Sequence, residues 1–344
     1  MQIRLRSFAG RGLLIVLLLS MQMVLFAQQP APKPLFSDPV YDGAADPVII
    51  YNKQQRKWWM FYTNRRANIQ DSTVGWVHGT RIGIAESDDG AVWKYKDTAN
   101  INYRPDSGYT FWAPDITEYK GVYHMFVTYV PGIFSNWDHP RDIIHLTSKD
   151  LLNWKFESIL PLVNHKVIDP SIFQLRDGSW RLWYNNEKDG KSIYYADSKD
   201  LYNWIDKGKA IDAHGEGPKV FRFQNRYWMV VDVWKGMDIY QSDDLTTWTR
   251  QPERILELPG KGLDDQAIGG HADVVVNNNR VFLFYFTHPG RSKANPAPHG
   301  STEAKRSVIQ LTELFYENNA LRCDRDKPVY IKLVSDKSFS WNMF

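Results

Sequence analysis

The chain has 344 residues and a formal net charge of only +3, which excludes a strongly basic nucleic-acid-binding protein. The three net positive charges come from Arg4, Arg6 and Arg11 at the N-terminus, so the rest of the chain is close to neutral. Cys323 is the single cysteine, which excludes an intramolecular disulfide bond; we expect it to be a small buried apolar residue.

The first 27 residues resemble a secretory signal peptide. Three arginines and no acid precede an apolar run over residues 13–26, and Ala27 ends the run. A membrane anchor is the alternative, but the run is shorter than the ~20 residues that a bilayer requires. We therefore predict cleavage before Gln28 and soluble export to the periplasm or beyond, with no membrane attachment after cleavage.

Residues 28–42 contain four prolines and are predicted to form an extended lead-in. No later stretch has the composition of a linker between domains. We therefore predict a single catalytic domain over residues 43–344, with residues 291–300 as a surface loop inside it.

The chain from residue 43 onward consists of five similar segments. Four open near a carboxylate and the fifth near a histidine, and each continues into short apolar and aromatic strand-like runs. The openings are Ala45-Asp46-Pro47, Ala113-Pro114-Asp115, Ile168-Asp169-Pro170, Gly215-Glu216-Gly217-Pro218 and Gly270-His271-Ala272-Asp273. The first four segments also contain Ser-x-Asp-x-x-x-Trp, ending at Trp93, Trp154, Trp204 and Trp248. The pattern predicts an all-β fold, a five-bladed β-propeller with four-stranded antiparallel blades.

The openings are predicted to share one location. The first strand of each propeller blade lies nearest the axis, so equivalent strand starts converge on one rim of the central channel. We therefore expect Asp46, Asp115, Asp169, Glu216 and His271 to meet there.

Several carboxylates facing one pocket suit glycoside hydrolysis, which needs an acid to protonate the leaving oxygen and a second carboxylate as base or nucleophile. Glu216 is the candidate acid because its longer side chain reaches further and small residues flank it. Asp46 is the candidate general base, and Asp169 is expected to orient Glu216 and tune its pKa. Capping of turns by the aspartates is the alternative.

Other residues, among them Asp115 with Trp112 beside it, are candidates for substrate binding. Trp76 and His78 lie in a long insertion in the first segment, and Trp112 precedes the second opening; all three are expected on rim loops, where the tryptophans can stack on a sugar ring. Arg291 and Arg306 flank the fifth-segment loop and could bind sugar hydroxyl groups. For His271, a structural role in the channel competes with hydrogen bonding to a catalytic carboxylate or binding of a cation or water.

The ordered set of motifs resembles glycoside hydrolase family 43 and related five-bladed propeller glycosidases. The resemblance covers nearly the whole chain after residue 27, and it implies inverting hydrolysis of arabinofuranosides or xylosides in plant or algal oligo- and polysaccharides. It assigns Asp46 as general base, Asp169 as pKa modulator and Glu216 as general acid, and it places the family's channel histidine on His271. No cofactor is expected to be required, although a structural calcium ion or a water molecule near His271 stays open.

Three alternatives remain from the sequence. A retaining fructosidase-like enzyme would use Asp46 as nucleophile. Related propeller families cleave anhydrogalactose, galactose or fructose units, and one of them resembles a scheme with a histidine as acid, a role that His78 or His271 could fill. A propeller that binds carbohydrate without catalysis would need the aromatic residues but not the acids. All three have a carbohydrate partner, and the oligomeric state stays open.

Overall fold

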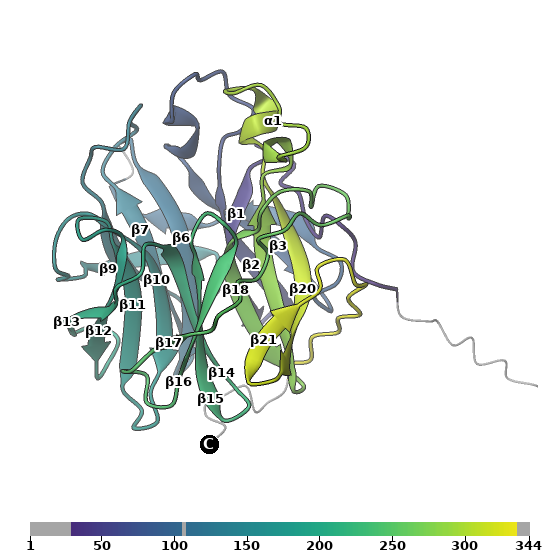
Figure 1. The fold of residues 1–344 in the computed structure, drawn as a ribbon. Helices are drawn as coiled ribbons and strands as arrows, with labels where there is room; N and C mark the ends of the chain where they lie inside the picture. Colours follow the sequence, from purple (N-terminus) through teal and green to yellow (C-terminus); the bar gives the residue numbers. More distant parts are fainter. Residues whose placement is uncertain (1–28, 105–107, 336–344) are drawn as a thin grey trace, which may run out of the picture.

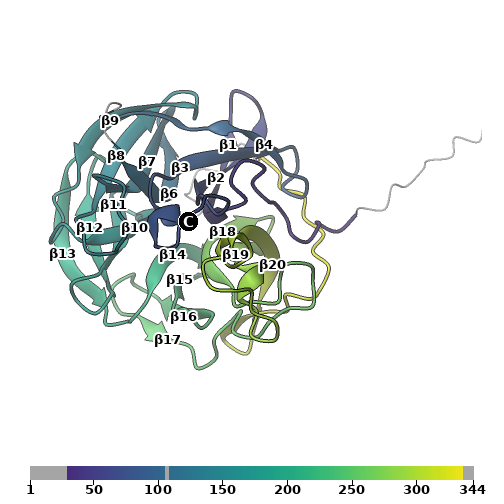
Figure 2. The same ribbon diagram turned by 90° about the horizontal axis from the view of Figure 1, so that it is seen from above.

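A computed structural model describes residues 29–104 and 108–335 of the chain. Five β-sheets surround a central axis, and Figure 2 shows them from above as the blades of a ring. The predicted signal peptide at residues 1–27 lies outside the described residues. Among the residues that are described, the longest helix is one short turn, and none could cross a membrane.

Each blade contains four antiparallel strands in chain order, counted outward from the axis. The first two blades contain β1 (Ala44–Asn52), β2 (Lys57–Asn64), β3 (Arg81–Ser87) and β4 (Lys94–Thr98), then β6 (Thr110–Tyr119), β7 (Val122–Val130), β8 (Asp142–Ser148) and β9 (Asn153–Ile159). The third contains β10 (Val167–Gln174), β11 (Trp180–Asn186), β12 (Ser192–Ser198) and β13 (Trp204–Ile211). The last two contain β14 (Glu216–Phe223), β15 (Arg226–Asp232), β16 (Met237–Ser242) and β17 (Thr249–Arg250), then β18 (Gly270–Asn277), β19 (Arg280–Thr287), β20 (Val308–Glu317) and β21 (Ala320–Cys323).

The predicted five-bladed propeller is therefore confirmed, with one addition. A short strand, β5 (Asn100–Asn102), joins the outer edge of the second blade by pairing parallel to β9. The few helical turns are η1 (Gly75–Val77), η2 (Pro289–Arg291) and α1 (Thr302–Lys305). The loop that carries α1 stands above the ring in Figure 1.

The repeated Ser-x-Asp-x-x-x-Trp motif forms the turn between the third and fourth strands. In the third blade, the Ser198 hydroxyl accepts a hydrogen bond from the Leu201 amide at 3.0 Å, and the Trp204 indole donates to the Leu201 carbonyl at 2.9 Å. Leu201 has a left-handed backbone with φ of 70°, which the turn enforces. The second blade repeats these bonds, so the motif is structural.

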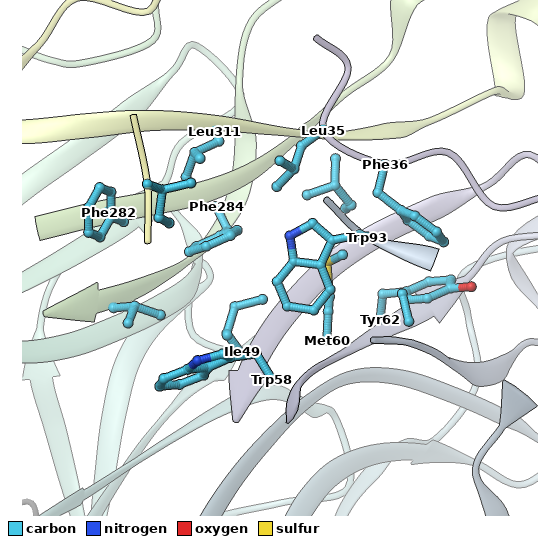
Figure 3. Close-up of a cluster of buried hydrophobic side chains, with 14 of the residues drawn as sticks. Leu35, Phe36, Ile49, Trp58, Met60, Tyr62, Trp93, Phe282, Phe284 and Leu311 are labelled. Carbon is cyan, nitrogen blue, oxygen red and sulfur yellow. The ribbon is translucent and has the colours of Figure 1, made fainter. Parts of the chain in front are cut away.

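Both ends of the described chain close the ring at the seam between the fifth and first blades. Phe36 from the lead-in forms an antiparallel bridge with Ile309 of β20, and Leu333 near the C-terminus donates its amide proton to Asp89 of the first blade. Figure 3 shows the apolar cluster at this seam, where side chains of the lead-in, the first blade and the fifth blade pack together. Burial of this cluster, and not a covalent link, holds the ring closed.

Replacing Phe284 with Ala is expected to lower the unfolding free energy by about 3–5 kcal/mol, because Phe284 is fully buried at the seam against Trp93. Urea denaturation followed by tryptophan fluorescence measures this loss. The matched variant Phe315→Ala, at a position that is 38% exposed, should lose less than about 1 kcal/mol. Equal losses in the two variants would contradict a seam held by apolar packing.

Candidate active site

A large open pocket of ≈ 2060 Å³ lies where the first strands of the blades begin. Its wall contains three of the sequence-predicted carboxylates, from the first, third and fourth blades, and the histidine of the fifth blade. These residues are Asp46, Asp169, Glu216 and His271. The pocket therefore brings together all three predicted catalytic residues.

The backbone at the strand starts explains how the carboxylates reach the pocket. Every first strand is interrupted by a register shift at its opening, as between Ala45 and Val48 or between Ile168 and Ser171. Within this bulge Asp46 and Asp169 have left-handed backbones with φ of 51° and 58°. Asp is one of the few residues that tolerate this conformation. The bulge turns these side chains toward the pocket.

The openings are not equivalent position by position, contrary to the expectation from the sequence. Gly217, with φ of 59°, occupies the bulge position of the fourth blade, so Glu216 stands one residue earlier than Asp46 and Asp169 do in theirs. A Cβ atom at Gly217 would come within 2.6 Å of the His271 ring. Glycine is therefore needed both for the backbone angle and for the packing of His271.

Asp115 does not join the other acids at the pocket, which corrects the prediction that all five openings meet. Ala113 holds the bulge position of the second blade, so Asp115 lies two residues further into the strand. There it forms an ion pair with Lys219 at 2.8 Å, and Lys219 also pairs with Asp273 at 2.8 Å. All three side chains are buried and fasten the inner strands below the pocket.

Asp46 is held by an arginine that the sequence analysis did not identify. Arg65 donates from Nη2 to both carboxylate oxygens of Asp46, at 3.1 and 3.2 Å. Its other terminal nitrogen lies 3.2 Å from His288 Nε2. Burial keeps the pKa of His288 well below its usual range, and its Nδ1 faces the Arg306 carbonyl at 2.7 Å. The neutral ring therefore donates from Nδ1 and accepts from Arg65, which fixes the guanidinium on Asp46.

Asp169 lies between the other catalytic candidates. Its Oδ2 accepts a hydrogen bond from the Gly217 amide at 3.0 Å, next to Glu216, and it lies 3.8 Å from His271 Nδ1. The same histidine nitrogen is 3.6 Å from Asp46. Burial, followed by the charges of Glu216 and Asp46, raises the pKa of Asp169 well above its usual range. Asp169 therefore lies close enough to both outer carboxylates to be affected by the charge of each.

Glu216 is the most accessible of the three, with a side chain that is 25% exposed. It accepts a hydrogen bond from the Trp234 indole at 3.0 Å and pairs with Lys191 at 3.3 Å. Lys191 also pairs with Glu187 at 3.0 Å, and Glu187 pairs with Arg141 at 2.6 Å. The cations on this side of the pocket are therefore matched by acids.

A further carboxylate, Asp232, stands at the position where the first and second blades have threonine. The hydroxyl groups of Thr63 and Thr128 each accept a hydrogen bond from a bulge amide of the next blade. The Asp232 carboxylate likewise accepts one from the backbone amide of His271, at 2.8 Å. Burial and the charge of Glu216 raise the pKa of Asp232 to about 7. Asp232 is the cross-strand neighbour of Glu216. The Asp232 carboxyl group therefore keeps a proton on this side of the pocket near neutral pH.

Replacing Asp232 with Thr is expected to flatten the pH dependence of stability. An Asp with a raised pKa binds more protons in the folded state, so its contribution to stability is present at low pH and is lost as the pH rises from about 4 to 7. The loss of unfolding free energy between pH 5 and pH 8 should shrink by about 2 kcal/mol in Asp232→Thr. Urea denaturation at both pH values measures it, and an unchanged slope would show that Asp232 is charged throughout.

The predicted aromatic residues line the pocket only in part. Trp76 and Trp112 border it but are 8% and 9% exposed, and the Trp112 indole donates to the Val77 carbonyl. His78 is fully buried behind Trp112 and bonds to His139 at 2.8 Å, so it does not face substrate as the sequence suggested. Trp137, which the sequence analysis missed, borders the pocket and is 54% exposed.

The two predicted arginines have different surroundings. Arg291 borders the pocket. Arg306 does not, because it pairs with Asp42 at 2.8 Å and with Asp264 at 2.6 Å and so ties the fifth blade to the chain before the first. The structure therefore places Arg306 outside the pocket, where it braces the fold.

Four of the residues that sequence analysis missed closely follow the second strand of a blade. That strand runs antiparallel to the first and ends at the same rim, as the pairing of Glu216 with Asp232 shows. Residues just after second strands include Arg65, Glu187, Trp234 and His288. The ends of the second strand-like runs were the signal that could have found them.

The carboxylates next to His271 have protein partners, and the calcium ion or water molecule expected near His271 stays a prediction. Calcium takes about six to eight oxygen ligands, whereas within residues 29–104 and 108–335 no group of three or more His, Cys, Asp or Glu side chains is arranged to hold a metal. Asp46 and Asp169 are instead engaged by Arg65 and by the Gly217 amide.

Solved structures of glycoside hydrolases share this fold. A thermostable family-43 glycoside hydrolase is 19% identical, with a TM-score of 0.62 over 86% of this chain and 97% of its own. A family-43 β-1,3-galactosidase bound to galactodeoxynojirimycin is 13% identical, with a TM-score of 0.59 over 82% of this chain and 93% of its own. CoXyl43, a β-xylosidase/α-arabinofuranosidase from a compost microbial metagenome, is 13% identical, with a TM-score of 0.57 over 86% of this chain and 95% of its own.

Sequence comparisons place the chain in a family. A probable sucrose-6-phosphate hydrolase of Psychromonas ingrahamii is 26% identical over 208 residues, which cover 53% of this chain and only 37% of that protein. The model of the glycosyl hydrolases family 43 matches residues 36–233, more than half of the chain and including Asp46, Asp169 and Glu216. The chain therefore belongs to glycosyl hydrolase family 43.

Proposed function

We propose that this protein is an exported glycosidase that acts on O-glycosyl bonds, inverts the anomeric configuration and removes terminal arabinofuranosyl, xylosyl or related units from plant or algal oligo- and polysaccharides. The observation that carries the proposal is the convergence of Asp46 and Glu216 on one pocket. Asp169 lies between them: it accepts a hydrogen bond from the Gly217 amide next to Glu216, and it lies near the His271 ring, which also lies near Asp46. The xylosidase/arabinofuranosidase and galactosidase named among the structural relatives support this class of sugar.

In this mechanism Asp46 is the general base and Glu216 the general acid. Asp46, oriented by Arg65, takes a proton from a water molecule, whose oxygen attacks the anomeric carbon. Glu216 gives its proton to the glycosidic oxygen as the bond to the anomeric carbon breaks. The products are the free sugar and the shortened oligosaccharide, and transfer of one proton from Asp46 to Glu216 through solvent restores the enzyme.

Asp169 acts as a positioning residue. It holds the Gly217 amide next to Glu216, and burial together with the neighbouring carboxylates raises its pKa. Asp232, whose pKa is raised to about 7, keeps a proton on the acid side of the pocket near neutral pH. The leaving group would meet the exposed part of Trp234, whose indole orients Glu216.

A screen of aryl glycosides and of plant and algal oligosaccharides, with product analysis, tests the proposal. We expect release of a single terminal sugar, and NMR of the first-formed product should show the anomer opposite to that of the substrate. A product that retains the configuration would instead make Asp46 a nucleophile. Binding without any product would leave a non-catalytic propeller.

Export is proposed from the basic and apolar pattern of the first 27 residues. Expression of the whole chain in a bacterial host, followed by mass spectrometry of the released protein, tests it. The expected N-terminal residue is Gln28. An uncleaved chain in the cytoplasmic fraction would contradict export.

A further inference from the structure

We propose that the pocket accepts a carbohydrate that carries an anionic group, a carboxylate or a sulfate ester, and that Arg291 is the principal ligand of this group. The proposal rests on the proposed glycosidase function and names the chemical class of its substrate. The wall concerned is formed by residues 288–305, which include the loop above the fifth blade in Figure 1.

This wall carries positive charge that the described residues do not neutralise. Residues 288–305 contain Arg291, Lys293 and Lys305 but only one acid, Glu303, which is 3.5 Å from Arg306. The Lys305 ammonium is bound by backbone carbonyls and has no acidic partner in the described part of the chain; it donates to Ile69 O at 2.8 Å. The opposite side of the pocket differs, since Glu187 and Glu216 match its cations.

Arg291 is held in place with its ligand-binding nitrogens still available. Its Nε donates to the Ala304 carbonyl at 2.9 Å, and its guanidinium lies 5.7 Å from the centre of the Trp76 ring. Within residues 29–104 and 108–335 it forms no ion pair, and neither Nη atom has a hydrogen-bond partner. Two parallel N–H groups on a fixed guanidinium match the geometry of a carboxylate or a sulfate.

The surroundings of Arg291 make an anion more favourable than a neutral hydroxyl group. The Arg291 side chain is exposed at the pocket, yet desolvation of its guanidinium by the surrounding wall and the nearby charge of Arg65 lower its pKa to about 10. The positive charge is therefore destabilised in the free protein, and a bound anion would relieve that repulsion, whereas a hydroxyl group would not.

The position of Arg291 assigns the anionic group to one side of the scissile bond. Trp76 packs edge-on against His288, with ring centres 6.1 Å apart, and His288 orients Arg65 on Asp46. Arg291 therefore lies on the side of the general base. In the proposed mechanism this side contacts the sugar unit that is released, so the charge belongs to that unit or to a branch on it.

Isothermal titration of the full-length Glu216→Gln protein tests the proposal without turnover of the ligand. The probes are two matched pairs: xylotriose with and without a glucuronic acid branch, and a galacto-oligosaccharide with and without a sulfate ester. At low ionic strength an anionic member should bind about ten- to a hundred-fold more tightly than its neutral partner, the range expected for hydrogen bonds to charged groups. Added salt should reduce the advantage.

Variants separate the charge of Arg291 from its shape. In the Glu216→Gln background, Arg291→Gln should abolish the preference for the anionic ligand, and Arg291→Lys should keep part of it. The matched control Arg56→Gln, at an exposed hairpin position on the opposite rim, should leave the preference unchanged. Equal binding of charged and neutral ligands, no binding of either anionic probe, or an equal loss for both ligands in Arg291→Gln would overturn the proposal.

The two pairs also identify the source of the anion, because preference in one pair only assigns the carboxylate or the sulfate. Failure of this inference is distinguishable from failure of the glycosidase assignment. The inference is measured by binding, whereas the proposed function is measured by turnover in the wild-type enzyme. An active enzyme that prefers neutral sugars would refute only the inference.

Discussion

Replacing Glu216 with Gln should lower kcat/KM by about a hundred- to ten-thousand-fold on a natural glycoside, the range that general acid catalysis contributes. Gln has nearly the same shape and can still accept the hydrogen bond from the Trp234 indole, but it has no proton to give to the leaving oxygen. Initial rates of sugar release measure the effect. The loss should be much smaller on a dinitrophenyl glycoside, because that leaving group departs without protonation.

This dependence on the leaving group separates an acid from a binding residue. A residue that only bound substrate would slow natural and dinitrophenyl glycosides alike. The matched control is Glu317→Gln, at an exposed position at the end of β20, and it should keep wild-type rates. Wild-type activity of Glu216→Gln on the natural glycoside would remove Glu216 from the mechanism.

Replacing Asp46 with Asn should also lower kcat by about a hundred- to ten-thousand-fold, and here the loss should persist on dinitrophenyl glycosides. Asn tolerates the left-handed backbone of this position, where φ is 51°, so the fold should survive. The amide cannot take a proton from water, and it loses the charge that pairs with Arg65. Steady-state kinetics on both kinds of glycoside measure the effect.

Mass spectrometry distinguishes the two roles open to Asp46. A general base never bonds to the sugar, so wild-type enzyme mixed with a 2-fluoroglycoside that bears a good leaving group should keep its mass. A mass increase located at Asp46 would identify a nucleophile and a retaining enzyme. The control Asp88→Asn, at an aspartate with an 84% exposed side chain, should show normal kinetics.

The fold could be predicted because the sequence repeats what each blade requires locally. Ser148, Asp150 and Trp154 recur at the same spacing in the first, third and fourth blades, and each copy builds its own turn from hydrogen bonds within seven residues. Such short-range features are visible in a sequence. The strand order then follows from antiparallel neighbours in chain order.

The site could be predicted only in part, because its register depends on bulges that sequence does not display. Alignment of the segments on their acids placed Asp115 with Asp46, whereas alignment on Pro47 and Pro114 would have placed Ala113 there. The partners of the acids were harder still to predict. Arg65 and Asp232 reach the pocket from second strands, and their contacts depend on pairing between strands and blades.

The seam between the fifth and first blades has a consequence for catalysis. Glu216 belongs to the fourth blade and Asp46 to the first, so the shorter arc between acid and base crosses this seam. The lead-in around Phe36 and the segment around Leu333 hold this seam closed, so they help to set the distance between the two carboxylates, where sugar and water must fit. We therefore expect a fusion or truncation that disturbs either of these segments to change the rate of hydrolysis without altering a single residue of the pocket.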